Sequence, residues 1–291
     1  MDSFFSAPGL KLVKLNELEY MEALIAYRSQ YKNAEMMLEA TIRAIEKNMP
    51  SQESFSILSI GCGSGIFEKP FVNKLLESKK TISFVGIDPN QEECTAIEEW
   101  CQEIRRSQPS KFDFAIHPVG FDRFQSSQTF DIILLIHSLY YFPDIEPLIS
   151  KSYQLLKQGG MEIVAITPRT LINEPYELVC QRLLGRSPWS SEDLWEVLAK
   201  SGCNIPFCQE TIEFSVNITE CFHKESQLGK QLLNCLIGVN TNYFSPLQLQ
   251  LLLDYFKTIA QKTEGGEIVV PHCVDLFYFD KTDATNEAAS P

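Results

Sequence analysis

A glycine turn followed by an aspartate constrains the fold of this chain more than any other feature of its sequence. The apolar run at residues 57–60 leads into Gly61-Cys62-Gly63-Ser64-Gly65, and the next apolar run, at residues 84–87, ends in Asp88. Glycines let the backbone turn sharply and let a ligand approach closely, and an acid ending the next strand can accept hydrogen bonds from both hydroxyls of a ribose. Together they predict a nucleotide-like ligand lying across the ends of two parallel strands.

Strands and helices alternate through the segment that contains this turn. Strands are expected at residues 56–60, 81–87, 112–117, 130–137 and 161–167, and helices at 67–78, 91–104 and 145–156. Such alternation is typical of right-handed crossovers that build a parallel sheet with helices on both faces. Apolar residues at helical spacing also predict two helices before the first strand, within residues 17–48.

The alternation stops after Pro168. A helix is expected at residues 191–201, two strands at 208–218 and 267–279, and between these strands a helical insertion or lid at 224–237 and 246–263. The chain therefore divides into four expected regions. These are an N-terminal helical cap (1–50), a ligand-binding core (51–168), a segment that completes the sheet and carries a substrate-side insertion (169–280), and a disordered tail (281–291).

Composition limits the partners of the chain. Its 291 residues are 44% apolar and its formal charge is −13 without a block of Lys and Arg, which argues against nucleic acid or an anionic membrane and favours a small molecule. The opening residues do not resemble a secretory leader and no long apolar run follows, so a cytoplasmic location is expected. The nine cysteines are irregularly spaced, and several, such as Cys62 and Cys235, lie within apolar strand or helix patterns. They are therefore expected to be reduced, packed thiols instead of a disulfide framework. Cys203 and Cys208 form a close pair with no second pair nearby, so no metal site is expected. Nothing in the sequence indicates the oligomeric state.

The order of the parts resembles a known enzyme class. After the fourth strand come Ser138-Leu139-Tyr140-Tyr141-Phe142-Pro143-Asp144 and then Leu155-Leu156-Lys157-Gln158-Gly159-Gly160 before another apolar strand. From about residue 56 to 167 this resembles class I S-adenosylmethionine-dependent methyltransferases. A dinucleotide dehydrogenase would carry G-x-G-x-x-G instead of the G-x-G-x-G found here. The resemblance implies an α/β, Rossmann-like sheet that is mostly parallel, with an antiparallel last strand.

Within that class the chain is similar to histamine N-methyltransferase and its relatives. The similarity rests on Leu-Ser-Ile-Gly-x-Gly-x-Gly, on Ile-x-x-Leu-Tyr-Tyr-x-x-Asp and on the N-terminal Tyr-x-Glu helix. It implies S-adenosylmethionine as cofactor. By resemblance, the residues that would contact it are Gly61, Gly63 and Gly65 (amino acid part), Asp88 (ribose), Ile136 and Glu93 (adenosine, with Glu93 where the family has glutamine) and Gly120 to Asp122 (adenine).

The substrate side differs from the family. Where the family holds a diamine with a carboxylate, an amide and an asparagine, this chain has Asn33, His137 and His272. A buried ammonium without a counter-ion is costly, so histamine itself is not favoured. Tyr20 and Leu24 would close the pocket or belong to the core, and Tyr140 and Tyr141 would form aromatic walls or pack at a helix start. Trp189 would line the site or anchor the insertion.

The two histidines leave the chemistry open. An imidazole titrates near neutral pH, so His137 and His272 could act as general base or as donors to a carboxylate, and His137 could equally be a hydrogen-bonded core residue. The expected function is methyl transfer to a small molecule, first to an amine or imidazole-type nitrogen. The alternatives are O-methylation of a small carboxylic acid or phenol with His137 as base or donor, and a catalytically inactive methyltransferase-like binding protein.

Overall fold

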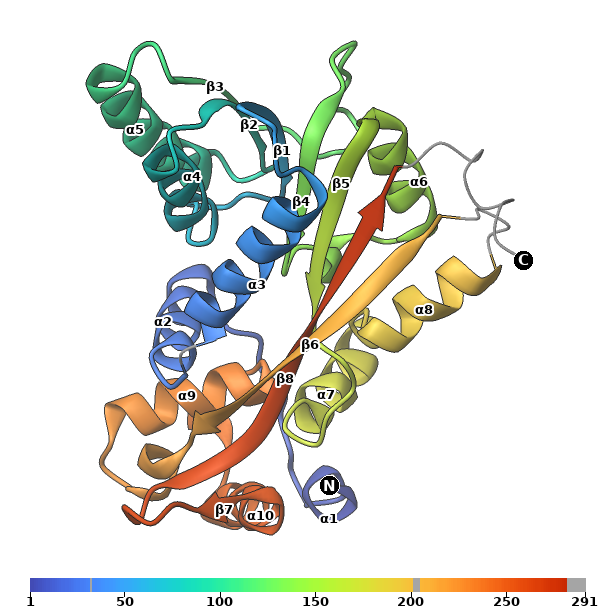
Figure 1. Cartoon of the computed structure of the whole chain (residues 1–291). Coiled ribbons are helices and arrows are strands. Elements are labelled where there is room, and N and C mark those ends of the chain that lie inside the picture. The colour runs from blue at the N-terminus through green and yellow to red at the C-terminus, as the bar shows by residue number, and fades with distance from the viewer. Residues whose placement is uncertain (32, 201–204, 282–291) are drawn as a thin grey trace. The chain divides into compact units, whose positions relative to one another are not determined.

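The computed structural model describes residues 1–31, 33–200 and 205–281 (Figure 1). The chain forms two compact units, each built from segments distant in sequence. The core unit comprises Ala34–Thr167, Trp189–Thr211 and Val274–Pro291, and the appended unit comprises Met1–Asn33, Pro168–Pro188 and Ile212–Cys273. Residues 282–291 of the expected tail and Cys203 lie outside the described residues.

A mostly parallel sheet forms the centre of the core unit. Its first five strands are β1 (Ser54–Ile60), β2 (Thr81–Ile87), β3 (Phe112–His117), β4 (Phe130–Ile136) and β5 (Leu156–Ile166), and the strand order is β3-β2-β1-β4-β5-β8-β6. These five strands pair in parallel, whereas β8 (Ile268–Asp280) runs antiparallel to β5. The α/β, Rossmann-like fold expected from the sequence is confirmed, including the antiparallel strand near the sheet end.

Helices cover the sheet where the sequence predicts them. They are α3 (Asn33–Asn48), α4 (Glu68–Glu77), α5 (Gln91–Ser107), α6 (Glu146–Leu155) and α8 (Ser191–Lys200), and α4 and α5 lie on one side of the sheet with α6 on the other (Figure 1). Apolar side chains of β1, β4 and β5 pack with α6 and α8 around Leu135, Leu148 and Leu194, which are fully or almost fully buried. This packing fixes the strand ends that carry the functional residues.

One strand begins earlier than the sequence indicated. β5 was expected from residue 161, but it starts at Leu156, which pairs with Phe130 before the register shifts. Gly159 has a φ of +76°, which suits glycine. The Lys-x-Gly-Gly segment is therefore the irregular start of a strand as well as a turn.

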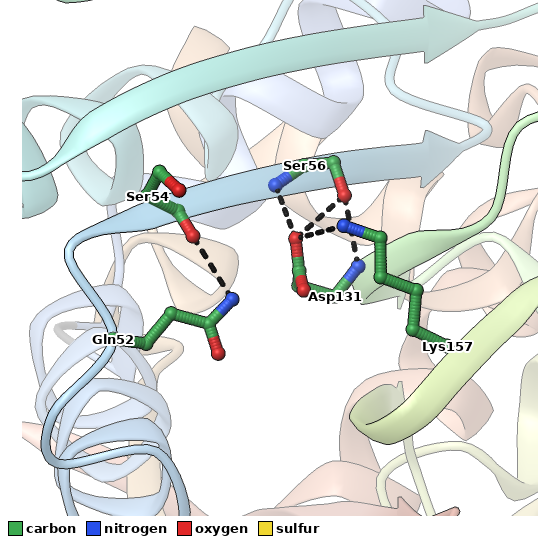
Figure 2. Close-up of polar contacts among 5 residues, drawn as sticks. All are labelled: Gln52, Ser54, Ser56, Asp131 and Lys157. Atoms are coloured by element: carbon green, nitrogen blue, oxygen red, sulfur yellow. Dashed lines mark hydrogen bonds and ion pairs between the residues drawn. The ribbon is translucent and has the colours of Figure 1, made fainter.

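A polar cluster ties the beginnings of β1, β4 and β5 together (Figure 2). Asp131 Oδ2 accepts hydrogen bonds from the Ser56 backbone N–H at 2.7 Å, from the Ser56 hydroxyl at 2.6 Å and from Lys157 Nζ at 2.8 Å. Burial alone would raise the pKa of Asp131, but the bonds from Lys157 and Ser56 outweigh it, so this pKa lies below its usual value. The cluster gives Lys157 of the Leu-Leu-Lys-x-Gly-Gly segment a structural role.

A second buried acid lies in the middle of β5. Burial raises the pKa of Glu162 to about 8. Its Oε1 lies 2.6 Å from Ser152 Oγ, which itself lies 3.0 Å from the Ile149 carbonyl oxygen, and among the described residues its Oε2 has no partner. A protonated Glu162 can donate to Ser152 while Ser152 donates to Ile149, so this chain of contacts fits a neutral carboxyl group.

The appended unit is largely helical. It contains α1 (Asp2–Phe5), α2 (Glu17–Arg28), α7 (Glu174–Leu184), α9 (Gln227–Ile237), α10 (Pro246–Ile259), the short strand β7 (Gln261–Lys262), the outer part of β6 (Phe207–Asn217) and the start of β8. Its own apolar core includes Phe4, Val179, Leu232 and Phe256. The helical insertion between β6 and β8 is confirmed.

The helix α7 and the end of α10 differ from the sequence interpretation. No helix was expected at residues 174–184, yet Pro175 stands in the first turn of α7, where its missing N–H costs nothing, and Gly185 ends the helix at a φ of +73°. The last helix was expected to reach residue 263 but ends at Ile259, because Gln261 and Lys262 pair with β8 instead. The end of α10 is set by a tertiary contact that overrides helical periodicity, whereas α7 carries local helix signals that the sequence interpretation did not use.

Candidate functional site

The glycine turn and Asp88 lie within hydrogen-bonding distance of each other. The N–H groups of Gly61 and Cys62 donate to the Ile87 carbonyl oxygen at 2.8 and 3.1 Å, and the Gly63 N–H donates to Asp88 Oδ2 at 3.0 Å. The three turn glycines have φ values of +73°, +50° and +80°, a region that side chains other than glycine rarely occupy. The carboxyl ends of β1 and β2 therefore form one polar edge, as the sequence predicted.

Of the three glycines, Gly63 has the most space beside it. A Cβ at Gly61 would lie 2.6 Å from Ser138 Cβ, and a Cβ at Gly65 would lie 2.8 Å from Ile97 Cδ1. At Gly63 the corresponding atom would meet only Glu93 Oε2, at 3.6 Å. Gly61 and Gly65 are thus needed for packing, whereas Gly63 offers an open backbone face between Asp88 and Glu93 that suits close approach of a ligand.

The start of α5 holds both acids at this face. Asp88 Oδ1 accepts from the Asn90 N–H at 2.9 Å, and the Asn90 side chain caps α5 by accepting from the Glu92 and Glu93 N–H groups at 2.9 and 3.2 Å. The cap fixes Glu93 in the first turn of α5, so that its carboxylate lies at one side of the open backbone face of Gly63. Both acids are therefore positioned by local backbone geometry.

A further acid lies behind the turn, and sequence reasoning did not identify it. The Ser59 hydroxyl donates to Glu68 Oε1 at 2.7 Å, and both residues are buried. Burial raises the pKa of Glu68 to about 7, although the bond from Ser59 opposes this. The first turn of α4 thus supplies a carboxyl group beneath the turn. An acid directly after a glycine turn is the signal that could have indicated it.

The loop expected to border adenine is held by Lys151. Lys151 Nζ donates to the carbonyl oxygens of Phe121, of Phe124 at 2.8 Å and of Asp122 at 3.4 Å, and it lies 4.4 Å from the centre of the Phe121 ring. The Asp122 side chain is 79% exposed, and its Oδ1 would lie 2.5 Å from a Cβ at Gly120. Sequence analysis did not single out Lys151, since nothing in the helix pattern distinguishes it.

At the end of β4, His137 adopts an unusual backbone conformation and contacts Tyr140. Its φ is +52°, and its N–H donates to the Ala165 carbonyl oxygen at 3.0 Å. Its Nδ1 lies 3.2 Å from Tyr140 Oη, which lies 3.0 Å from Thr167 Oγ1 and accepts from the Thr167 N–H at 2.9 Å. Non-glycine residues at positive φ cost about 1 kcal/mol or more and gather at functional sites. Ile136, just before His137, is half-buried.

Ser138 carries a buried hydroxyl beside the turn. Among the described residues its Oγ has no hydrogen-bond partner, and it would lie 3.3 Å from a Cβ at Gly61. Buried polar groups are nearly always hydrogen-bonded, so such a group fits a site completed by a polar ligand. Sequence analysis assigned no role to Ser138.

The other aromatic candidates of the core unit differ in exposure. Tyr141 is 70% exposed, whereas Trp189 is half-buried and its indole N–H donates to the Phe142 carbonyl oxygen at 2.8 Å. Trp189 therefore braces the segment that follows His137. Tyr140, by contrast, is part of the hydrogen-bond cluster with His137.

Four expected substrate residues belong to the appended unit or its boundary: Tyr20, Leu24, Asn33 and His272. Tyr20 and Leu24 are on α2, and the buried Asn33 is the first residue of α3. His272 is 5% exposed, its ring packs edge-on against Phe214 and its Nδ1 lies 3.3 Å from Thr170 Oγ1. Burial lowers the pKa of His272 to about 4, so this imidazole is neutral at neutral pH. The roles of these residues in substrate binding remain predictions.

Within residues 1–31, 33–200 and 205–281, no group of three or more His, Cys, Asp or Glu side chains is arranged to hold a metal ion. Over the same ranges, no helix combines the length and the apolar composition that a membrane span needs.

The fold and this edge of the sheet define a class of protein. The strand order, the open glycine turn beside Asp88 and the buried Ser138 hydroxyl fit a class I S-adenosylmethionine-dependent methyltransferase domain. In agreement, residues 58–161 match a family model described as a methyltransferase domain. S-adenosylmethionine is accordingly the cofactor of this domain.

Similar proteins support this class. The chain is 24% identical over 174 residues to a ubiquinone biosynthesis O-methyltransferase of Pelagibacter ubique, covering 60% of this chain and 66% of that protein. A protein of the same name from a Bradyrhizobium species is 24% identical over 134 residues, covering 45% and 48%. The chain thus spans between about half and two thirds of the length of these curated relatives.

Solved structures show the same fold. The YcgJ protein of Bacillus subtilis superposes with a TM-score of 0.55 at 14% identity, covering 84% of this chain and 98% of that one. The plantazolicin methyltransferase BpumL in complex with S-adenosylhomocysteine (SAH) superposes with a TM-score of 0.53 at 16% identity, covering 96% and 93%. At such identities the similarity concerns the fold alone.

Proposed function

We propose that this protein transfers the methyl group of S-adenosylmethionine to a small molecule. The open backbone face of Gly63 beside Asp88 is the observation that carries the proposal. The cofactor supplies an activated methyl group, so the protein mainly has to hold an acceptor in line with it. Positioning of this kind is worth about 7 to 11 kcal/mol in well-oriented reactions.

The proposed cofactor contacts follow from the sequence motifs and their placement. Gly61, Gly63 and Gly65 would face the amino acid part, Asp88 the ribose, and Ile136 and Glu93 the adenosine. The segment from Gly120 to Asp122 would border the adenine, held in place by Lys151. His137 is proposed as the residue that contacts the acceptor, and Tyr20, Leu24, Asn33, Tyr140, Tyr141, Trp189 and His272 as further substrate residues.

Two acceptor atoms remain candidates. The resemblance to histamine N-methyltransferase favours an amine or ring nitrogen, and a ring nitrogen needs no base near neutral pH. The curated relatives named O-methyltransferases favour an oxygen, as does Asn33 in place of the family carboxylate. A phenol would need a base, whereas a carboxylate would need only hydrogen-bond donors.

Calorimetry and label transfer test the proposal. Titration with S-adenosylmethionine and with SAH should show saturable binding of each, and binding of neither would overturn the proposal. Methyl-labelled cofactor is then incubated with matched amines, phenols and carboxylic acids that share one carbon skeleton. Labelled product is expected with the wild type and strongly reduced with Asp88→Asn. Cofactor binding without transfer to any of these acceptors would favour the inactive binding protein instead.

A further inference from the structure

The carboxylate of Glu93 borders the open backbone face of Gly63. A Cβ placed on Gly63 would lie 3.6 Å from Glu93 Oε2 and, apart from the chain neighbours of Gly63, would meet no other atom of the described residues within 4 Å. Glu93 is half-buried in the first turn of α5, where the Asn90 side chain accepts a hydrogen bond from its backbone N–H at 3.2 Å. The Glu93 side chain therefore lies beside the space that a ligand on this face would fill.

The two acids at this face are paired differently. Asp88 accepts hydrogen bonds through both carboxylate oxygens, from the Gly63 N–H at 3.0 Å and from the Asn90 N–H at 2.9 Å. The Glu93 carboxylate, by contrast, makes no hydrogen bond or ion pair with any residue in the described part of the chain. Its negative charge is thus left for a ligand to pair with.

A buried thiol shows that this edge of the sheet carries a negative field. Burial raises the pKa of Cys94 to about 11. The negative charges of Asp88, Glu98 and Glu93 add to this rise, although a hydrogen bond to the Asp88 carbonyl oxygen opposes it. Because nearby carboxylates disfavour a further negative charge, the same surroundings favour a positive one.

The side chain of Lys69 lies at the last glycine of the turn and does not neutralise this field. Its Cε would lie 3.3 Å from a Cβ at Gly65. Burial raises the pKa of Cys101 to about 12, and the charge of Lys69 opposes this rise, so Lys69 acts on the buried side of α5. Within the described residues it forms no ion pair with Asp88 or Glu93.

The two forms of the cofactor differ in charge. S-adenosylmethionine and SAH share the adenine, the ribose and the amino acid part, but only S-adenosylmethionine has a methyl group and a positive charge on sulfur. This sulfur is bonded both to the ribose 5′ carbon and to the side chain of the amino acid part. In the proposed binding mode, with the ribose at Asp88 and the amino acid part against Gly63, the sulfur would lie on the face that Glu93 borders. A half-buried carboxylate attracts a cation there and has no such attraction for a neutral thioether.

We propose that Glu93 is a specificity-determining residue that makes the cofactor site select the cationic S-adenosylmethionine over the neutral SAH, and that it thereby limits inhibition by the product. This inference rests on the proposed function and concerns regulation of the same site. In the transfer step the acceptor forms a bond to the methyl carbon, the bond from that carbon to sulfur breaks, and its electron pair stays on sulfur. The sulfur loses its positive charge in this step, so the attraction to Glu93 is lost as the product forms.

Calorimetry of Glu93→Gln tests this charge selection. The substitution keeps the shape of the side chain and removes its charge. We expect the affinity for S-adenosylmethionine to fall about fivefold, the effect of one partly screened charge pair, while the affinity for SAH stays within about twofold. The matched control is Glu92→Gln, which removes the same charge from an exposed side chain in the same helical turn. In this control the ratio of the two affinities should change by less than twofold.

Three calorimetric results would overturn the inference. They are an equal loss of affinity for both ligands in Glu93→Gln, which would indicate an adenosine contact alone, unchanged affinities in Glu93→Gln, and a ratio altered as much by Glu92→Gln. Each of these would leave the proposed function intact. Absence of binding of either ligand to the wild type would instead overturn the proposed function.

Salt and product inhibition give independent measurements. Since the Debye length falls from about 10 Å at 0.1 M salt to about 3 Å at 1 M, high salt should move the affinity ratio of the wild type toward that of Glu93→Gln. In transfer assays Glu93→Gln should raise KM for S-adenosylmethionine and make inhibition by SAH relatively stronger, without lowering kcat. A wild-type ratio that does not respond to salt, or a lower kcat with unchanged KM in Glu93→Gln, would overturn the inference.

Discussion

Replacing Gly63 by alanine separates backbone strain from loss of cofactor space. The added methyl group would meet only Glu93 Oε2, at 3.6 Å, so the protein itself accommodates it, and the cost of a φ of +50° is about 1 to 2 kcal/mol of folding free energy. If the cofactor approaches this backbone face, the added methyl group crowds the bound cofactor and makes the binding free energy less favourable by about 1 to 3 kcal/mol. This corresponds to a loss of affinity for SAH of roughly 5- to 150-fold.

Gly159 provides the matched control. Its φ is +76° and a Cβ there would have no atom within 4 Å, so Gly159→Ala imposes the same kind of strain away from the glycine turn. Urea denaturation should show similar destabilisation of the two variants, and calorimetry should show weakened SAH binding for Gly63→Ala alone. Equal SAH affinities for Gly63→Ala and the wild type would refute the reasoning that the open face receives the cofactor.

Four further substitutions test other parts of the account. The pKa of Glu162 in the folded protein is raised to about 8. The contribution of the neutral carboxyl group to stability is therefore complete below its ordinary pKa and is lost as the pH rises toward 8. Glu162→Gln should therefore remove a decline of about 1.4 kcal/mol per pH unit between roughly pH 5 and 8, and an unchanged pH profile in denaturant titrations would contradict a buried neutral acid. Asp131 has a lowered pKa in the folded protein. The stabilisation by its carboxylate is therefore present above its ordinary pKa and is lost as the pH falls through the lowered pKa. Asp131→Ala should lower the free energy of unfolding by about 2 kcal/mol, because the Ser56 N–H loses its acceptor. Lys157→Met should lower it by only about 1 kcal/mol, since Lys157 is 41% exposed. The reverse order of the two effects would be inconsistent with the contacts in Figure 2. Asp88→Asn should weaken SAH binding about tenfold through lost charge-assisted hydrogen bonds, and calorimetry showing no change would exclude the ribose role.

The cofactor edge could be predicted from sequence because its geometry is local. The glycines after one apolar strand and the aspartate after the next have few conformations open to them, and parallel pairing brings the two strand ends together. The bond between the Gly63 N–H and Asp88 follows from that spacing. The five parallel strands and the helices between them were predicted for the same reason, since their periodicity is strong, although β5 begins earlier than expected.

The residues that sequence analysis missed act through tertiary contacts. Glu68 meets Ser59 and Lys151 meets the carbonyl oxygens of Phe121 and Phe124 only once the sheet has formed. The low pKa of His272 likewise depends on the burial of its ring. The contacts of Lys151 and the burial of His272 leave no periodic pattern in the sequence, so neither spacing nor propensity could indicate them.

A crystal structure of the protein with SAH tests the central claim most directly. The account predicts that both ribose hydroxyls lie within hydrogen-bonding distance of the Asp88 carboxylate and that the amino acid part lies against the backbone of Gly63. SAH bound elsewhere, or bound with its ribose away from Asp88, would contradict it.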